Sequence, residues 1–303
     1  MIILGDKYEF TKYERLYLKK NSLDITHIKR TESAGLIPEL QRIVTEKKPE
    51  KIVLNLSEKP TKELIHFLTS LELQGIHFIT FEHFMEKYLR KCFIPYDSED
   101  LSYLDNIRPY SILGYMTKRT IDIMGAGIVL VLSLPVMLYA LRRIRKESPG
   151  SILFKQKRVG LNGRLFTCYK FRSMHEDSHF DPYTRENDER IFPFGHTMRK
   201  MRIDELPQLF NVLCGDMHLI GPRAEWHILV EEYEKELPYY SERHLVRPGI
   251  TGWAQVNYPY GQNIEDTRQK LMYDLYYIKY WNVWLEIKTA FKTVGVVLKK
   301  MGV

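Results

Sequence analysis

The first third of the chain alternates short β-branched runs with amphipathic stretches. KIVLNLS (51–57) predicts a buried strand, and IHFITF (76–81) predicts a second one. Between them, TKELIHFLTSLELQ predicts a helix with Thr61 as its N-cap, and FEHFMEKYLRKCF predicts another helix after the second strand. This order predicts a small α/β domain. A stretch rich in Pro, Asp and Ser (95–111) is the predicted linker that follows it.

Residues 121–141, IDIMGAGIVLVLSLPVMLYAL, have the length and apolar character of a bilayer-crossing helix. Positive charge, which favours the cytoplasmic side, flanks both ends: Lys118, Arg119, Arg142, Arg143, Arg145 and Lys146. Pro135 removes a helix hydrogen bond, and the Ser133 hydroxyl could satisfy a freed carbonyl. We therefore expect two helices joined by a break, forming a re-entrant hairpin over about 118–146. A single-pass anchor and a buried core helix are the alternatives.

The C-terminal segment 281–301, WNVWLEIKTAFKTVGVVLKKM, places apolar residues at helical spacing. They are Trp281, Trp284, Leu285, Ile287, Phe291, Val294, Val297 and Leu298. Between them stand the lysines Lys288, Lys292, Lys299 and Lys300. The pattern is typical of a basic amphipathic helix that lies in a lipid headgroup layer, and it also fits a helix packed on a core.

Composition narrows the class of protein. With 303 residues, 44% hydrophobic and 27% charged, the chain can form two globular domains and is neither disordered nor a multi-span membrane protein. The net charge of +7 suits an acidic partner. Because the cations accompany carboxylates and an apolar run, we do not expect nucleic acid as that partner. From the three scattered cysteines and the lack of a secretory signal pattern, we expect residues 1 to about 110 to stay in the cytoplasm.

The densest functional signal is RKMRIDELPQLFNVL (199–213). Three cations precede the adjacent carboxylates Asp204 and Glu205, and Pro207 suits the first turn of a helix that runs to Leu213. Acidic residues at a helix start also stabilise any helix through its dipole. Neighbouring helical side chains diverge by about 100°, so the two carboxylates cannot serve one atom as acid and base. One could attack phosphorus while the other holds Mg²⁺.

Further candidate cations lie in two other segments. Lys170 and Arg172 follow the strand-like run LFTCY and would lie on one side of an extended segment. Arg223 stands in a Gly-Pro turn, which suits a guanidinium clamp on phosphate. Each of these residues taken alone also fits a solvated surface cation.

From about residue 116 to the C-terminus, the chain resembles the bacterial sugar transferase family, the monotopic polyprenyl-phosphate phosphoglycosyl transferases that initiate exopolysaccharide and glycoconjugate assembly. The matching segments, in family order, are KRTIDI, FKQKRVGLNGRLFTCYKFRSM, DELPQLFNVLCGDMHLIGPR, RPGITGWAQVN and YDLYYIKYW. The resemblance implies an α+β, mostly helical catalytic domain over 111–303, with a re-entrant membrane hairpin and amphipathic interfacial helices. A small α/β, dinucleotide-fold-like domain and the linker would occupy 1–110.

The same resemblance implies a reaction. Asp204 would attack the β-phosphate of a UDP-sugar, release UMP and carry the sugar phosphate until polyprenyl (undecaprenyl) phosphate accepts it. Glu205 would bind Mg²⁺. Phosphate charge would be neutralised, and the metal or nucleotide site supported, by Lys170, Arg172, Arg199, Arg223 and Asp274. The enzyme would be monotopic on the inner leaflet of the bacterial cytoplasmic membrane and could form a homo-oligomer. The alternative is a catalytically inactive membrane-bound scaffold or regulator of a glycan assembly complex.

Two positions depart from the family pattern. The hairpin break commonly carries a Ser-Pro pair, whereas here Leu134 precedes Pro135 and the serine is Ser133. The loop after Gly221 commonly reads Pro-Arg-Pro, whereas here alanine follows Arg223. We expect the bend to be kept and the turn around Arg223 to be looser.

Overall fold

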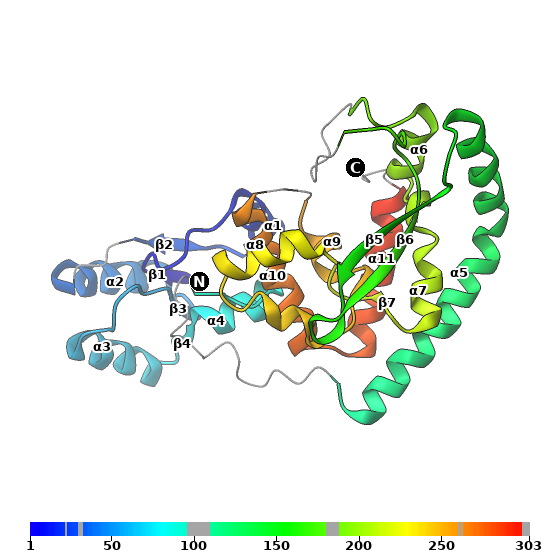
Figure 1. Ribbon diagram of the computed structural model, residues 1–303. Coiled ribbons are helices and arrows are strands. Elements are labelled where there is room, and N and C mark those ends of the chain that lie inside the picture. Colours follow the sequence, from blue (N-terminus) through cyan, green and yellow to red (C-terminus); the bar gives the residue numbers. More distant parts are fainter. Residues whose placement is uncertain are drawn as a thin grey trace. The chain divides into compact units, whose positions relative to one another are not determined.

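Figure 1 shows the computed structural model of the chain. It describes residues 1–21, 23–29, 33–95, 110–179, 188–259, 261 and 263–298. The chain divides into two compact units, Met1–Phe93 and Ile94–Val303. Most of the predicted linker lies outside the described residues, as do Lys299 and Lys300.

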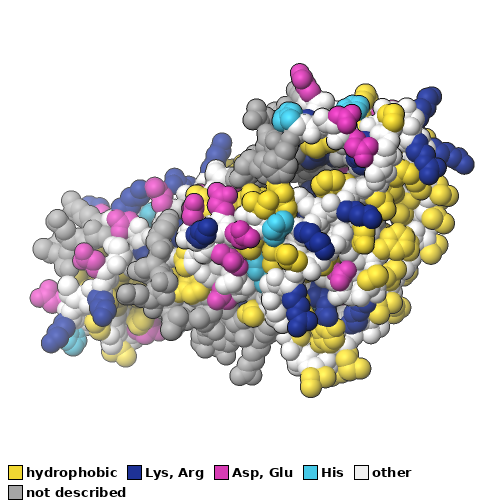
Figure 2. Space-filling view, viewed as in Figure 1, with side chains coloured by type: hydrophobic (Ala, Val, Ile, Leu, Met, Phe, Trp, Pro, Cys, Tyr) yellow, Lys and Arg dark blue, Asp and Glu magenta, His cyan; other side chains and the backbone are white. Residues whose placement is uncertain are grey.

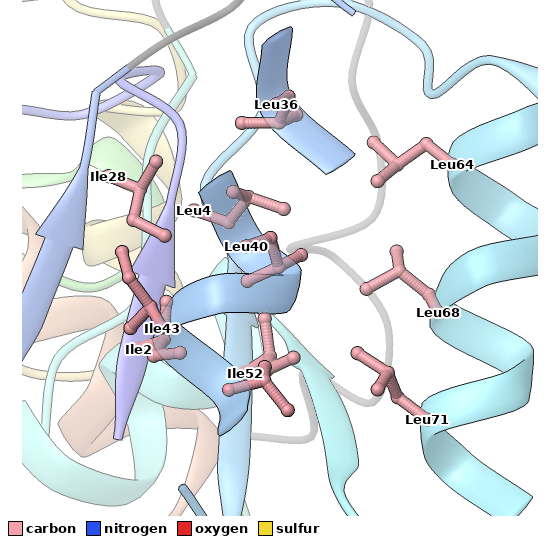
Figure 3. Packing of buried hydrophobic residues seen from close by; sticks show 11 residues of the cluster. Ile2, Leu4, Ile28, Leu36, Leu40, Ile43, Ile52, Leu64, Leu68 and Leu71 are labelled. Carbon is pink, nitrogen blue, oxygen red and sulfur yellow. The ribbon is translucent and has the colours of Figure 1, made fainter. Parts of the chain in front are cut away.

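The first unit is the small α/β domain that the sequence predicts. Its parallel sheet has the strand order β2-β1-β3-β4, with β1 (Ile2–Leu4), β2 (Thr26–Ile28), β3 (Lys51–Leu54) and β4 (His77–Thr80). Its helices are α1 (Lys12–Lys20), α2 (Ser33–Lys47), α3 (Lys62–Leu73) and α4 (Phe81–Phe84), which continues into a π-helix (Met85–Leu89). Figure 3 shows Leu64, Leu68 and Leu71 of α3 facing the side chains of α2 and of the sheet.

Local polar contacts set the ends of these elements. β3 ends before Asn55, a buried residue whose carboxamide accepts from the Tyr8 N–H at 3.0 Å and donates to two backbone carbonyls. The predicted cap on α3 is confirmed, because the Thr61 hydroxyl accepts from the Leu64 N–H at 3.3 Å. The helix predicted after β4 ends at Arg90, which has a left-handed φ of 58°.

The second unit mixes helices with two small sheets. Its helices are α5 (Ile112–Glu147), α6 (Pro193–Lys200), α7 (Gln208–Cys214), α8 (His227–Glu236), α9 (Trp253–Asn257), α10 (Ile264–Lys279) and α11 (Val283–Leu298). Its 3₁₀ turns are Leu161–Gly163, Ile203–Glu205 and Ser241–Leu245. The strands β5 (Leu153–Val159) and β6 (Leu165–Phe171) form an antiparallel hairpin, and β7 (His218–Ile220) pairs in parallel with β8 (Gly249–Thr251).

The apolar run forms one continuous helix, α5, where the sequence predicted two helices separated by a break. Pro135 lies inside it, so the carbonyl of Val131 loses its usual N–H donor. The Ser133 hydroxyl donates instead to the carbonyl of Leu130, at 3.3 Å. Figure 1 shows α5 as a long curved helix, so this proline does not end it.

Both halves of α5 pack on the same unit. In the first half Ala126 is fully buried, and in the second half Ala140 and Ile144 pack near Phe171 and Phe192. Apolar side chains on its other faces are exposed: Ile112, Leu113, Met116, Ile123, Met124, Ile128, Val129, Val131, Leu132, Leu134, Val136 and Leu138. Figure 2 shows hydrophobic side chains gathered along the edge that α5 forms. The helix could cross a membrane by length and composition, and only 17% of its most apolar window is buried, which disfavours a core helix.

The C-terminal helix α11 also turns apolar side chains outward. Trp284, Phe291 and Leu298 are 79%, 75% and 76% exposed, while Leu285 and Thr289 face the interior. This arrangement favours the predicted surface helix over the alternative of a helix packed entirely on a core.

Candidate active site

Asp204 and Glu205 lie in a single 3₁₀ turn, Ile203–Glu205, between α6 and α7. We call it the acidic turn. The sequence predicted them in the first turn of an α-helix, but α7 begins three residues after Glu205. Successive residues of a 3₁₀ turn are about 120° apart, so the two carboxylates still diverge as expected. Both are nearly buried, at 8% and 5% exposure.

Three cations surround the Glu205 carboxylate. Lys170 Nζ lies 2.9 Å from Oε1, and the two terminal nitrogens of Arg223 lie 3.4 and 3.3 Å from the same oxygen. Arg202 lies 3.4 Å from Oε2. Burial alone raises the pKa of Glu205, but the charges of Lys170, Arg223 and Arg202 outweigh it and hold that pKa well below its ordinary value. Glu205 is therefore ionised.

Asp204 has the opposite environment. Burial raises its pKa, the charge of Lys170 opposes this, and the neighbouring charge of Glu205 raises the pKa further. Arg199, half-buried in the last turn of α6, lowers it, as does Arg202. Among the described residues, no group donates a hydrogen bond to the buried oxygen Oδ1 of Asp204. A buried oxygen without a donor favours the approach of a ligand.

Asn211 holds α7, the helix that follows the acidic turn, against β6. Its side-chain oxygen accepts from the Tyr169 N–H at 3.1 Å, and its amide donates to the carbonyl of Thr167 at 2.8 Å. Because Lys170 follows on the same strand, these bonds hold its ammonium opposite Glu205.

Close backbone packing holds the loop that carries Arg223. A Cβ on Gly249 would lie 2.1 Å from the nitrogen of Gly221, and a Cβ on Gly252 would lie 2.2 Å from its oxygen. The Gly249 N–H donates to the carbonyl of Pro222 at 2.8 Å. The GPR and RPGITG segments therefore form one compact support, and neither glycine has room for a side chain.

Asp274 reaches the site through a residue that the sequence did not single out. It lies buried on α10 and binds Arg243 at 2.9 Å. The same Arg243 nitrogen donates to the carbonyl of Arg223, at 2.9 Å, and its partner nitrogen donates to the Tyr240 hydroxyl at 2.6 Å. Burial raises the pKa of Asp274 to about 6, although Arg243 opposes the rise. Arg243 belongs to none of the recognised segments, so only the fold reveals this role.

The structure separates Arg172 from Lys170. The Arg172 guanidinium is buried and donates to the hydroxyl of Ser148 at 2.6 Å and to the carbonyls of Ser148 and Pro149 at 2.7 and 3.0 Å. These bonds satisfy the backbone carbonyls that follow the end of α5. The predicted role of Arg172 in neutralising phosphate is therefore not supported by its contacts.

A second group of buried charges joins α5 to the rest of the unit. Lys118 lies 3.1 Å from Asp122 and 2.8 Å from Glu286 of α11, and Asp122 also pairs with His218 of β7. Arg119 donates to two carbonyls at the end of α7. The KRTIDI segment thus attaches the apolar helix to α7, β7 and α11.

The described residues thus combine an ionised carboxylate among cations, a second carboxylate whose Oδ1 has no donor, and a long exposed apolar helix that fits membrane association. The chain belongs to the bacterial sugar transferase family, whose model matches residues 113–300. The resemblance inferred from the sequence is confirmed.

Curated relatives share this part of the chain. It is 45% identical over 201 residues to the UDP-N-acetylgalactosamine-undecaprenyl-phosphate N-acetylgalactosaminephosphotransferase of Aeromonas hydrophila, covering 66% of this chain and 47% of the relative. The UDP-glucose:undecaprenyl-phosphate glucose-1-phosphate transferase of Escherichia coli K12 is 38% identical, with 61% and 41% covered. The protein of the same name in Caulobacter vibrioides is 39% identical, with 59% and 68% covered. The chain thus spans less than half the length of the first two relatives.

Proposed function

We propose that this protein transfers a sugar-1-phosphate from a UDP-sugar to polyprenyl (undecaprenyl) phosphate, releasing UMP, as the first step of exopolysaccharide or glycoconjugate synthesis. The names of the relatives support the reaction class. The observation that carries the assignment to this site is the buried oxygen Oδ1 of Asp204, which lacks a donor and lies in a turn surrounded by cations.

Two displacements at phosphorus account for the reaction. First, an Asp204 oxygen bonds to the β-phosphorus, the bond to the bridging anhydride oxygen breaks, and that oxygen leaves on UMP. Second, a phosphate oxygen of the polyprenyl carrier attacks the same phosphorus, and the Asp204 carboxylate leaves. Lys170 and Arg223 would then neutralise charge on the transferred phosphate. The product is a polyprenyl diphosphosugar.

The acidic turn also suits Mg²⁺. Proteins usually hold this ion through one or two carboxylates and the substrate's phosphates, rather than in a cage made only of side chains. Glu205 is ionised and would hold it, next to the free oxygen of Asp204. When bound, the ion would neutralise phosphate oxygens. Lys170 and Arg223, which contact Glu205 in this structure, would bind the diphosphate oxygens.

We also propose that the protein sits on the cytoplasmic face of the cytoplasmic membrane without crossing it. Both halves of α5 pack on the same unit, and basic residues flank both ends of its apolar run. To test this, the exposed Cys214 would be replaced, and single cysteines would be introduced before Lys118 and after Lys146. Both should react only with a reagent applied from the cytoplasmic side. Reaction from opposite sides would show a crossing helix.

The test of the reaction is UMP release from a panel of UDP-sugars without acceptor. A covalent intermediate predicts about one UMP per protein, together with label from the β-phosphate on the protein chain. Asp204→Asn should give neither signal, whereas Asp24→Asn, the same change at an exposed position of the first unit, should give both. Release by Asp204→Asn at the wild-type rate would assign the nucleophile elsewhere. No release from any sugar by the wild type would favour the inactive scaffold.

A further inference from the structure

Lys292 of α11 is a half-buried cation whose described contacts are neutral. Its ammonium binds the carboxamide oxygen of Asn257 and lies 4.8 Å from the ring centroid of Trp253. Lys288, one helical turn earlier, places its ammonium 5.6 Å from the same centroid. Two positive groups thus lie over one buried tryptophan.

The surroundings of Lys292 favour an anion. Burial and, to a lesser extent, the charge of Lys288 together lower the pKa of Lys292 to about 8. A partly buried ammonium normally gains its stability from an opposite charge, and neither the amide oxygen nor the ring supplies one. A phosphate between the two ammonium groups would supply it.

The surface beside the lysines is apolar. Exposed side chains recur at intervals of three and four residues along α11: Trp284, Ile287, Phe291, Val294 and Leu298. Lys288 and Lys292 directly follow Ile287 and Phe291, so the two lysines border this stripe on the helix surface. A ligand that matches both features carries a phosphate and a hydrocarbon chain.

We infer that Lys288 and Lys292, seated on Asn257 and Trp253, bind the phosphate group of a membrane lipid whose hydrocarbon chain lies along the α11 stripe. Two lipids share this chemistry: an anionic phospholipid and the polyprenyl phosphate acceptor. The second source rests on the proposed function, whereas the first does not.

The experiment titrates the full-length protein, in a neutral detergent, with phosphatidylglycerol or polyprenyl phosphate and counts bound lipids by native mass spectrometry. Lys288→Gln/Lys292→Gln should bind about 30-fold more weakly, because each lysine near a lipid surface contributes about 1 kcal/mol. Lys288→Arg/Lys292→Arg should retain binding. Lys59→Gln/Lys62→Gln, which removes the same charge from exposed positions of the first unit, should bind like the wild type.

The two lipids separate the sources. Loss confined to polyprenyl phosphate assigns an acceptor site, loss confined to phosphatidylglycerol assigns a headgroup site, and loss of both assigns a general lipid-phosphate site. Unchanged binding of both lipids, or an equal loss in Lys59→Gln/Lys62→Gln, would overturn the inference. UMP release by the wild type without acceptor is measured separately, so a failure of the proposed function is told apart from a failure of this site.

Discussion

One guanidinium nitrogen of Arg243 bonds both the Asp274 carboxylate and the backbone carbonyl of Arg223, each at 2.9 Å. Arg223 in turn contacts Glu205. A residue on α10 is thereby linked to the acidic turn through two arginines, and Arg223 joins the link with its backbone carbonyl on one side and its guanidinium on the other. This relationship gives Asp274 a positioning role that can be separated from direct contact with substrate.

Replacing Asp274 by Asn should impair the site more than the stability. Asn removes the anion that faces Arg243, but it also removes the burial cost that raises the pKa of Asp274, so the loss in unfolding free energy near pH 7 should stay below the roughly 3–5 kcal/mol of a broken buried ion pair. Because the Arg223 loop would loosen, we expect KM for the UDP-sugar to rise more than kcat falls. Denaturant unfolding and steady-state kinetics measure the two effects. A fall in kcat at unchanged KM would instead place Asp274 at the reacting atoms.

On the acid side, the pH dependence of UMP release should follow the raised pKa values of Asp204 and Asp274. As pH falls through about 6, Asp274 takes up a proton and its attraction for Arg243 weakens, while Asp204 loses nucleophilic charge at its own raised pKa. UMP release should therefore decline below about pH 6. In Asp274→Asn the contribution centred near pH 6 should be missing. An identical profile in both proteins would contradict this assignment.

Stability should change with pH in the opposite sense at Asp274. Its folded-state pKa of about 6 exceeds the ordinary 3.8, so the folded protein binds the proton more tightly than the unfolded chain. Its contribution is full below about 3.8 and is lost as pH rises through about 6, a change of roughly 3 kcal/mol. The difference in unfolding free energy between wild type and Asp274→Asn, measured from pH 4 to 7, should show this slope. A flat difference would refute it.

Arg172 and Lys170 should differ in what their removal affects. Arg172→Ala leaves several buried carbonyls beyond α5 without a hydrogen-bond donor, so we expect a loss of roughly 2–4 kcal/mol in unfolding free energy. The folded fraction should keep its KM for the UDP-sugar. Lys170→Ala should instead leave most of the stability and lower kcat/KM at least tenfold, since it removes a cation from the acidic turn. Equal kinetic losses would restore Arg172 to the phosphate site.

Glu205→Gln should alter the dependence on Mg²⁺. A neutral carboxamide leaves Lys170, Arg202 and Arg223 without their shared anion and offers the metal a weaker ligand. We expect kcat to fall at least 100-fold and the Mg²⁺ concentration for half-maximal activity to rise. Glu58→Gln, the same change at an exposed position of the first unit, is the control. An unchanged metal dependence would place the ion elsewhere.

Much of the local structure could be predicted because its causes are local. Short β-branched runs indicated β3 and β4, the hydroxyl of Thr61 marked the start of α3, and the apolar length of α5 indicated a membrane helix. The order of short segments also identified the family. For these strands and helices, the contacts that decide the structure lie within a few residues along the chain, where sequence spacing determines geometry.

The sequence by itself determined which residues are charged, which stretches are apolar and which family the chain belongs to. Only the tertiary structure decided that Lys170 meets Glu205 while Arg172 holds the chain beyond α5, and that Asp274 acts through Arg243. These ion pairs form between segments that are tens of residues apart in the sequence. The sequence around a cation does not indicate which distant carboxylate it will meet. Packing of the strands, loops and helices brings those partners together.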